Sequence, residues 1–155
     1  MHMQRQVRVA KSAIRNPSVL CEAYDYPKRV PFSRGMRVAL GDASMLFVSG
    51  TASVDENGRS VHVGDFEGQA RRVFSNIAAL LESEGADWHD VVRTTCYLAD
   101  FRYYDAFNTV RNEFYRQEGL EPLPASTCVQ AALCRPELLV EIEAIAVVPP
   151  ERRSA

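Results

Sequence analysis

The sequence predicts an α+β domain in which two helices pack on one face of a mixed β-sheet. The hydrophobic period changes along the chain, giving the order strands, helix, strand, helix, strand, strand. A length of 155 residues suits one domain, and 46% hydrophobic with 25% charged residues is a globular composition that excludes a disordered or fibrous chain. We expect an N-terminal arm over residues 1–30, one domain over 31–149 and a polar tail over 150–155.

The first half of the domain is expected to hold a hairpin and then a helix. A tight turn at Gly41-Asp42 joins the predicted strands 37–40 and 45–49. Apolar residues then recur at helical spacing, with Asp65 as the expected N-cap and Gly85 as the stop signal.

The second half begins with a β-branched strand over residues 91–98, followed by an amphipathic helix over 101–117. Two further strands are predicted over 126–133 and 138–147. We expect Arg135-Pro136 to join these two strands as a hairpin.

The last of these strands, in the run LLVEIEAIAV, contains two glutamates, Glu141 and Glu143. Alternation sends both to one face of the strand, and both faces are otherwise apolar. An ionised carboxylate buried without a partner is costly, so at least one glutamate is expected in a polar cleft or beside a hydrogen-bond donor. The alternative is that both lie at a sheet edge.

Two helices cover only one face of the predicted sheet. Because the last strand is apolar on both faces, we expect the uncovered face to pack against other copies of the chain. Closed homo-oligomers are the common solution.

Composition also restricts the class of protein. A net charge of −2 gives no electrostatic footprint for nucleic acid. The N-terminal residues lack the apolar centre of a secretory signal and no apolar run has membrane-spanning length, so we expect a cytoplasmic protein. The cysteines and histidines show no metal-ligand spacing, so we expect no metal site, no cofactor and reduced thiols at the following positions: Cys21, Cys96, Cys128 and Cys134.

Several segments in order carry a resemblance to a known family. They read FVSGTASV, GDFEGQARRVFSNIAALLESEGADWHDVVRTTCYLAD, YDAFNTVRNEFY and PASTCVQAALCRPELLVEIEAIAV. From residue 31 to 148 the chain resembles the Rid family, the reactive intermediate deaminases also called YjgF-like proteins. The resemblance implies a chorismate-mutase-like fold and a homotrimer whose sheets form a central barrel, with three ligand clefts between neighbouring subunits.

The resemblance also implies a chemistry. Deaminase members hydrolyse imines or enamines such as 2-aminoacrylate, using an arginine for the substrate carboxylate and a glutamate that orients water. The family's glutamate falls on Glu141 and its cleft cysteine on Cys128. Ser49, Gly50 and Asn108 match positions that line or support the cleft, although Asn108 is equally compatible with helix packing.

Two positions depart from the deaminase pattern. The carboxylate-binding arginine of the family is Ser126 here, and a cleft tyrosine is Phe32. A hydroxyl cannot replace the permanently charged fork of a guanidinium. We therefore expect a divergent member that does not follow the family's best-known reaction on 2-aminoacrylate.

The run CRPELLVEIEA, with FSRG near Arg34, also resembles the Rid-like half of chorismatases. In that interpretation Glu141 is a general acid whose pKa is raised by burial, and it protonates an enol ether. Arg135 and Arg34 are then candidate carboxylate anchors. The alternative for Arg135 is an exposed hairpin residue before a proline.

Three functions remain open from the sequence. The first is an enzyme that acts by acid/base or water-mediated chemistry on a small carboxylate-bearing metabolite, with Glu141 as the catalytic residue. The second is a non-catalytic module that binds such a metabolite. The third is the endoribonuclease or translation-inhibitor activity attributed to some Rid proteins, which the acidic balance of the chain disfavours.

Overall fold

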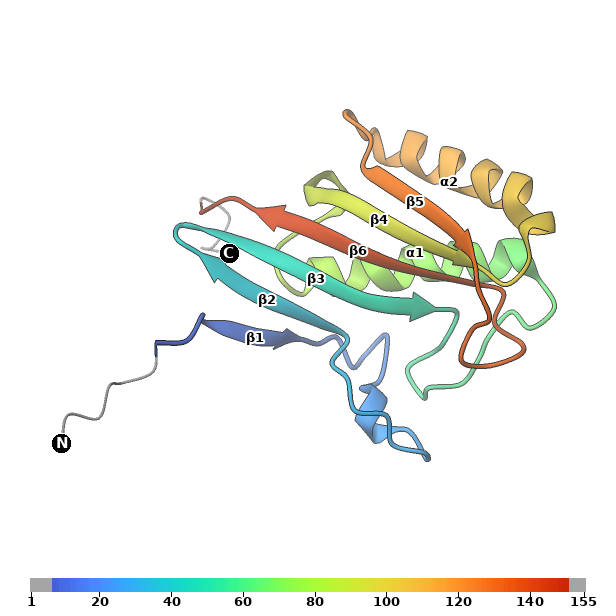
Figure 1. Cartoon of the computed structure of the whole chain (residues 1–155), viewed down its shortest axis with the longest axis horizontal. Helices are drawn as coiled ribbons and strands as arrows, with labels where there is room; N and C mark the ends of the chain where they lie inside the picture. Colours follow the sequence, from blue (N-terminus) through green and yellow to red (C-terminus); the bar gives the residue numbers. More distant parts are fainter. Residues whose placement is uncertain (1–6, 151–155) are drawn as a thin grey trace.

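The computed structural model describes residues 7–150, which form a six-stranded mixed sheet with two α-helices on one face (Figure 1). The predicted α+β fold class is confirmed. The strands are β1 (Lys11–Ile14), β2 (Gly35–Leu40), β3 (Ala43–Ala52), β4 (Val91–Leu98), β5 (Ala125–Gln130) and β6 (Val140–Val148). The helices are α1 (Phe66–Glu82) and α2 (Tyr104–Glu118), with short 3-10 helices at Ala23–Asp25, Trp88–Asp90 and Phe101–Tyr103.

The strand order is β1-β2-β3-β6-β4-β5, and all neighbours are antiparallel except β4 and β5. The predicted hairpin of the last two strands is wrong, because β4 lies between β5 and β6. The chain reaches β5 through α2, and residues 131–139 then carry it past β4 to the centre of the sheet. A strand that is apolar on both faces loses most contact with water in this central position.

The other predicted elements are confirmed with small changes at their ends. Gly41 makes the β2–β3 turn with a φ of 58°. The side chain of Asp65 caps α1 by accepting a hydrogen bond from the amide of Gly68 at 3.0 Å. Gly85 follows α1 in the left-handed region, with a φ of 69°. Within residues 7–150, no helix has the length and apolarity needed to span a bilayer.

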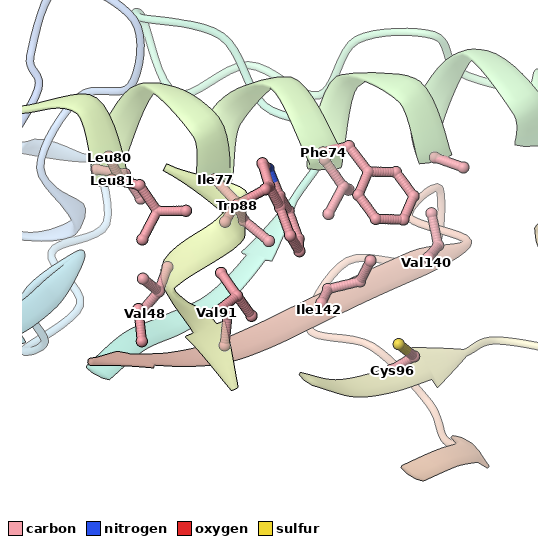
Figure 2. Close-up of a cluster of buried hydrophobic side chains, with 14 of the residues drawn as sticks. Val48, Phe74, Ile77, Leu80, Leu81, Trp88, Val91, Cys96, Val140 and Ile142 are labelled. Atoms are coloured by element: carbon pink, nitrogen blue, oxygen red, sulfur yellow. The ribbon is translucent and has the colours of Figure 1, made fainter. Parts of the chain in front are cut away.

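The core lies between the sheet and the helices. Val140 and Ile142 of β6 point toward α1, where they meet Phe74 and Trp88 (Figure 2). All four side chains are buried, and burying an apolar side chain of this size stabilises the fold by about 1.5–3 kcal/mol. Since alternate residues of a strand face opposite ways, this packing directs Glu141 to the face without helices.

The sheet begins earlier than the sequence predicts. β1 lies within the segment expected to be an arm, and it pairs with β2. Ile14 and Leu20 are fully buried, so this segment contributes to the core. Most of the predicted polar tail, residues 151–155, lies outside the described residues.

Candidate functional site

Glu141 lies in a groove of about 890 Å³. The groove is formed where β3, β4 and β6 meet two loop segments, residues 26–34 and 131–138. Several of the predicted site residues line it, together with two tyrosines that were not among the predicted site residues. Its lining includes Glu141, Gly50, Phe32, Arg34, Arg135, Tyr26 and Tyr97.

Gly50 makes room for the Glu141 carboxyl. The pairing of β3 with β6 is irregular between Val48 and Thr51, and Gly50 lies within this irregularity. A Cβ atom at position 50 would overlap Oε1 of Glu141. Only glycine therefore allows the carboxyl to rest against the backbone of β3 in this position.

The electrostatic environment of Glu141 favours its protonated form. Burial raises the pKa of the Glu141 carboxyl, and the negative charge of Glu143 adds to this rise. No group among residues 7–150 donates a hydrogen bond to this carboxyl that would offset the effect. Glu141 therefore retains its proton to higher pH than an exposed glutamate does, which suits a proton donor.

The second glutamate of the strand has a different environment. The hydroxyl of Tyr97 donates a hydrogen bond to Oε1 of Glu143 at 3.1 Å. Glu143 also lines a separate cavity of about 450 Å³ together with Arg93, Phe32 and Ser49. The two carboxylates thus share a face but differ in their partners.

Ser49 contributes to the shape of the β3 irregularity. Its hydroxyl donates to the carbonyl oxygen of Ser33 at 2.6 Å, and its amide donates to the carbonyl oxygen of Arg34 at 3.0 Å. These bonds fix residues 33 and 34 against β3. Ser49 thereby holds the segment that carries Phe32 to the groove.

Arg34 is enclosed within one wall of the groove. Its Nε donates to the carbonyl oxygen of Cys21 at 2.7 Å, and its Nη2 donates to the hydroxyl of Tyr26. The guanidinium also packs over the rings of Tyr26 and Phe32. With 3% of its surface exposed, Arg34 organises the wall and offers little surface to a ligand.

Arg135 is better placed to meet a ligand in this groove. Its Nη1 donates to the carbonyl oxygen of Gly58 at 2.9 Å and to the hydroxyl of Ser60 at 3.0 Å. The guanidinium lies 5.1 Å from the ring centroid of Tyr26 and is half-buried. Its Nε and Nη2 make no hydrogen bond within residues 7–150, so they remain for an anion.

The other predicted site residues lie on the opposite, helix-covered face of the sheet. Ser126 and Cys128 on β5 stand beside Thr94 and Cys96 of β4, which are buried under the helices. Asn108 projects from α2 and accepts a hydrogen bond from Arg111. One small ligand cannot touch Glu141 and this second group within the same chain.

Cys128 does not have the environment of a nucleophile. Burial raises the pKa of its thiol, which lowers the thiolate fraction at neutral pH.

All four cysteines are free, and the side chain of Cys134 is exposed. In the described part of the chain, no three His, Cys, Asp or Glu side chains are grouped to hold a metal ion.

Helix α1 forms side-chain hydrogen bonds to the ends of the two strands that line the groove. Gln69 donates to the carbonyl oxygen of Glu137 at 2.9 Å and accepts from the amide of Leu139 at 2.8 Å, just before β6. Asn76 donates to the carbonyl oxygens of Ala52 and Val54, at the end of β3. Both side chains are fully buried, so β3 and β6 are fixed to the helix at the end that bears the site.

Two residues beside the predicted site, Tyr97 and Arg111, have a signal in the sequence. Tyr97 has the alternation of the β4 face on which Arg93 and Thr95 lie. Arg111 follows Asn108 by three positions, which places both on one side of α2. Their partners could be identified only once β5 and β6 were placed.

A protein-family model described as Endoribonuclease L-PSP matches residues 26–148. The chain belongs to the Rid family. The 3-aminoacrylate deaminase RutC of Acinetobacter baylyi is 37% identical over 105 residues, covering 68% of this chain and 80% of that protein. A RutC family protein of Pyrococcus abyssi is 34% identical over 121 residues, covering 77% of this chain and 89% of that protein.

Solved structures agree with this assignment. The YjgF gene product of E. coli matches this Rid chain with a TM-score of 0.71 and 28% identity, covering 88% of this chain and 98% of that chain. The structure of E. coli TdcF with bound serine matches with the same values. The Rid fold of this chain is therefore shared with TdcF, whose solved structure contains bound serine.

Proposed function

We propose that this Rid protein hydrolyses a small enamine or imine that carries a carboxylate, with Glu141 as the group that transfers the proton. The Glu141 carboxyl carries the proposal, because it lies in a groove, its pKa is raised by burial, and no donor within residues 7–150 bonds to it. Such a carboxyl can supply a proton to a bound substrate and then take one from water.

For an aminoacrylate, the proposed reaction conserves atoms and charge at each step. Glu141 gives its proton to the carbon of the enamine double bond that does not bear nitrogen, which leaves an iminium ion. Water then adds to the carbon that bears nitrogen, and the Glu141 carboxylate takes the proton released. Ammonia departs as the carbonyl forms, so one water is consumed and the products are an oxo acid and ammonia.

The cleft of this enzyme is proposed to lie between neighbouring copies of the chain. The predicted ligand groups occupy opposite faces of one sheet, and a second copy can bring them together. Phe47 and Val147, which are 40% and 39% exposed, leave apolar surface on the face without helices. These features support the homotrimer that the resemblance to the Rid family implies.

Aminoacrylates are the first substrates to test. The 37% identity to a 3-aminoacrylate deaminase favours 3-aminoacrylate, whereas Ser126 in place of arginine argues against the usual pose of 2-aminoacrylate. Both should be generated freshly and assayed for release of ammonia and oxo acid. Chorismate belongs in the same panel, because a protonated Glu141 could also protonate an enol ether.

The matched variant for this assay is Glu141→Gln, which keeps the shape of the side chain and removes its proton. Turnover of the accepted substrate should fall by about 10²–10⁴-fold, the usual contribution of a positioned acid or base. Full turnover by Glu141→Gln, or no turnover of the whole panel by the wild-type chain, would overturn the proposal.

A second candidate is a protein that binds a small amino or oxo acid without changing it. The TdcF structure with bound serine favours it, as do Ser126 and Phe32 at the positions of the arginine and the tyrosine of the deaminase members. Thermal stabilisation by L-serine or pyruvate, without chemical change of any panel member, would select this function over catalysis.

A further inference from the structure

A group of side chains on α2 and β5 holds an arginine in a fixed position. Nη1 of Arg111 donates to the hydroxyl of Ser126 at 3.1 Å, and its Nη2 donates to Oδ1 of Asn108. The guanidinium also lies 5.0 Å from the ring centroid of Phe107, which is fully buried. Three neutral groups therefore orient this cation.

Arg111 has no acidic partner in the described part of the chain. Ion pairs within residues 7–150 join Arg37 to Glu84, Arg71 to Glu113 and Arg102 to Asp100, and none of these includes Arg111. Arg111 is half-buried, and its neighbours on β4 and β5 are uncharged hydroxyl and thiol side chains. A partly desolvated positive charge without a counter-charge attracts an anion.

The guanidinium keeps donors for such an anion. It has five N–H groups, and its two hydrogen bonds to Ser126 and Asn108 use one on each terminal nitrogen. The remaining three include Nε–H and face no carboxylate within residues 7–150, so they can donate to the oxygens of a bound carboxylate.

We infer that Arg111 is a carboxylate-binding residue of this chain, positioned by Ser126 and Asn108. The substitution of serine at position 126 then has a consequence beyond the loss of a charge. The small hydroxyl leaves space for an arginine from the helix and accepts one of its hydrogen bonds. The charge is moved from β5 to α2, which changes where a ligand carboxylate sits relative to Cys128.

The choice of a carboxylate rather than another anion rests on the proposed function, whereas the role of Arg111 as an anion-binding residue does not. L-serine and pyruvate are suitable probes because each is small and carries one carboxylate. Their affinities for the whole chain can be measured by isothermal titration calorimetry.

The expected result is that Arg111→Ala weakens both probes by about tenfold or more, because a charge-assisted bidentate contact is lost. Arg116→Ala removes the same charge from an exposed position on the same helix and should leave both affinities unchanged. If Arg111→Ala does not fold, Arg111→Gln replaces it as the test variant, because glutamine keeps the aliphatic part of the side chain over Phe107 and removes the charge.

A rescue experiment separates binding from a structural role. In Arg111→Ala combined with Ser126→Arg, the charge returns from the strand, and affinity for the probes should recover in large part. A role limited to helix packing would show no recovery.

The failures of the two proposals are distinguishable. If Arg111→Ala binds both probes like the wild type while Glu141→Gln has lost turnover, the inference on Arg111 is overturned and the proposed function stands. If the wild-type chain binds neither probe, the carboxylate site itself is overturned.

Discussion

At the scale of single residues, the contact between Gly50 and Glu141 is the most specific feature of the site. Glu141 could be selected from the sequence, because a carboxylate in a strand that is apolar on both faces requires a reason. Gly50 could not be selected in this way, because its contact with Glu141 depends on the irregular pairing of β3 with β6. Neither strand encodes that register by itself.

Gly50→Ala is expected to displace the Glu141 carboxyl, because the added Cβ would overlap Oε1. A displacement of about 1 Å can cost about 10²-fold in rate, so we expect kcat to fall by this order while the chain still folds. The double variant with Glu141→Gln should show no additional loss, since both changes remove the same interaction. Independent, multiplicative losses would contradict the contact.

Glu141→Gln should also change stability with pH. Burial raises the pKa of Glu141 in the folded chain, so the wild type loses stability as pH rises through that pKa, whereas glutamine does not titrate. Each unit of pKa difference between folded and unfolded chains corresponds to about 1.4 kcal/mol. Urea unfolding should show the variant gaining stability over the wild type as pH rises from acidic to neutral. A constant difference over this range would contradict the raised pKa.

At the scale of elements, α1 determines the geometry of the groove as well as the core. The hydrophobic period and the caps of this helix could be read from the sequence. The role of Gln69, a polar residue on its buried face, could not, because its partners Glu137 and Leu139 are about 70 positions away. A local pattern contains no information on such a partner.

Gln69→Leu is expected to destabilise the chain through the unpaired amide of Leu139 and carbonyl of Glu137. A buried backbone group left without a partner costs about 1–3 kcal/mol. Urea unfolding measures the change, and Gln117→Leu, at an exposed position of α2, is the matched control with little expected effect. Equal effects of the two substitutions would show that the Gln69 bonds do not secure β6.

The main error at this scale concerned connections. Helix and strand periods predicted most of the elements, but adjacency in sequence suggested a hairpin between β5 and β6. The parallel pairing of β4 with β5 cannot be read from either strand, since it depends on the crossover through α2. β1 cannot be predicted from the sequence either, because a strand of four residues is too short to show a hydrophobic pattern.

At the scale of the whole molecule, the two halves of the candidate site face away from each other. Glu141 lies on the open face, and Arg111 lies on the side covered by the helices. The sequence resemblance named most members of both groups, yet alternation along β5 and β6 separates them within one chain. A cleft that uses both groups therefore requires two copies of the chain, as in a closed homotrimer.

The most direct test of this shared cleft is a mixing experiment with two variants, Glu141→Gln and Arg111→Ala, assayed below saturation with the accepted aminoacrylate. Each variant alone should keep at most about a tenth of wild-type turnover. When equal amounts are unfolded and refolded together, some clefts receive Glu141 from one chain and Arg111 from its neighbour. We predict recovery of about one quarter of wild-type turnover, as random assembly of a closed ring requires. A mixture no more active than its components would contradict a site shared between copies.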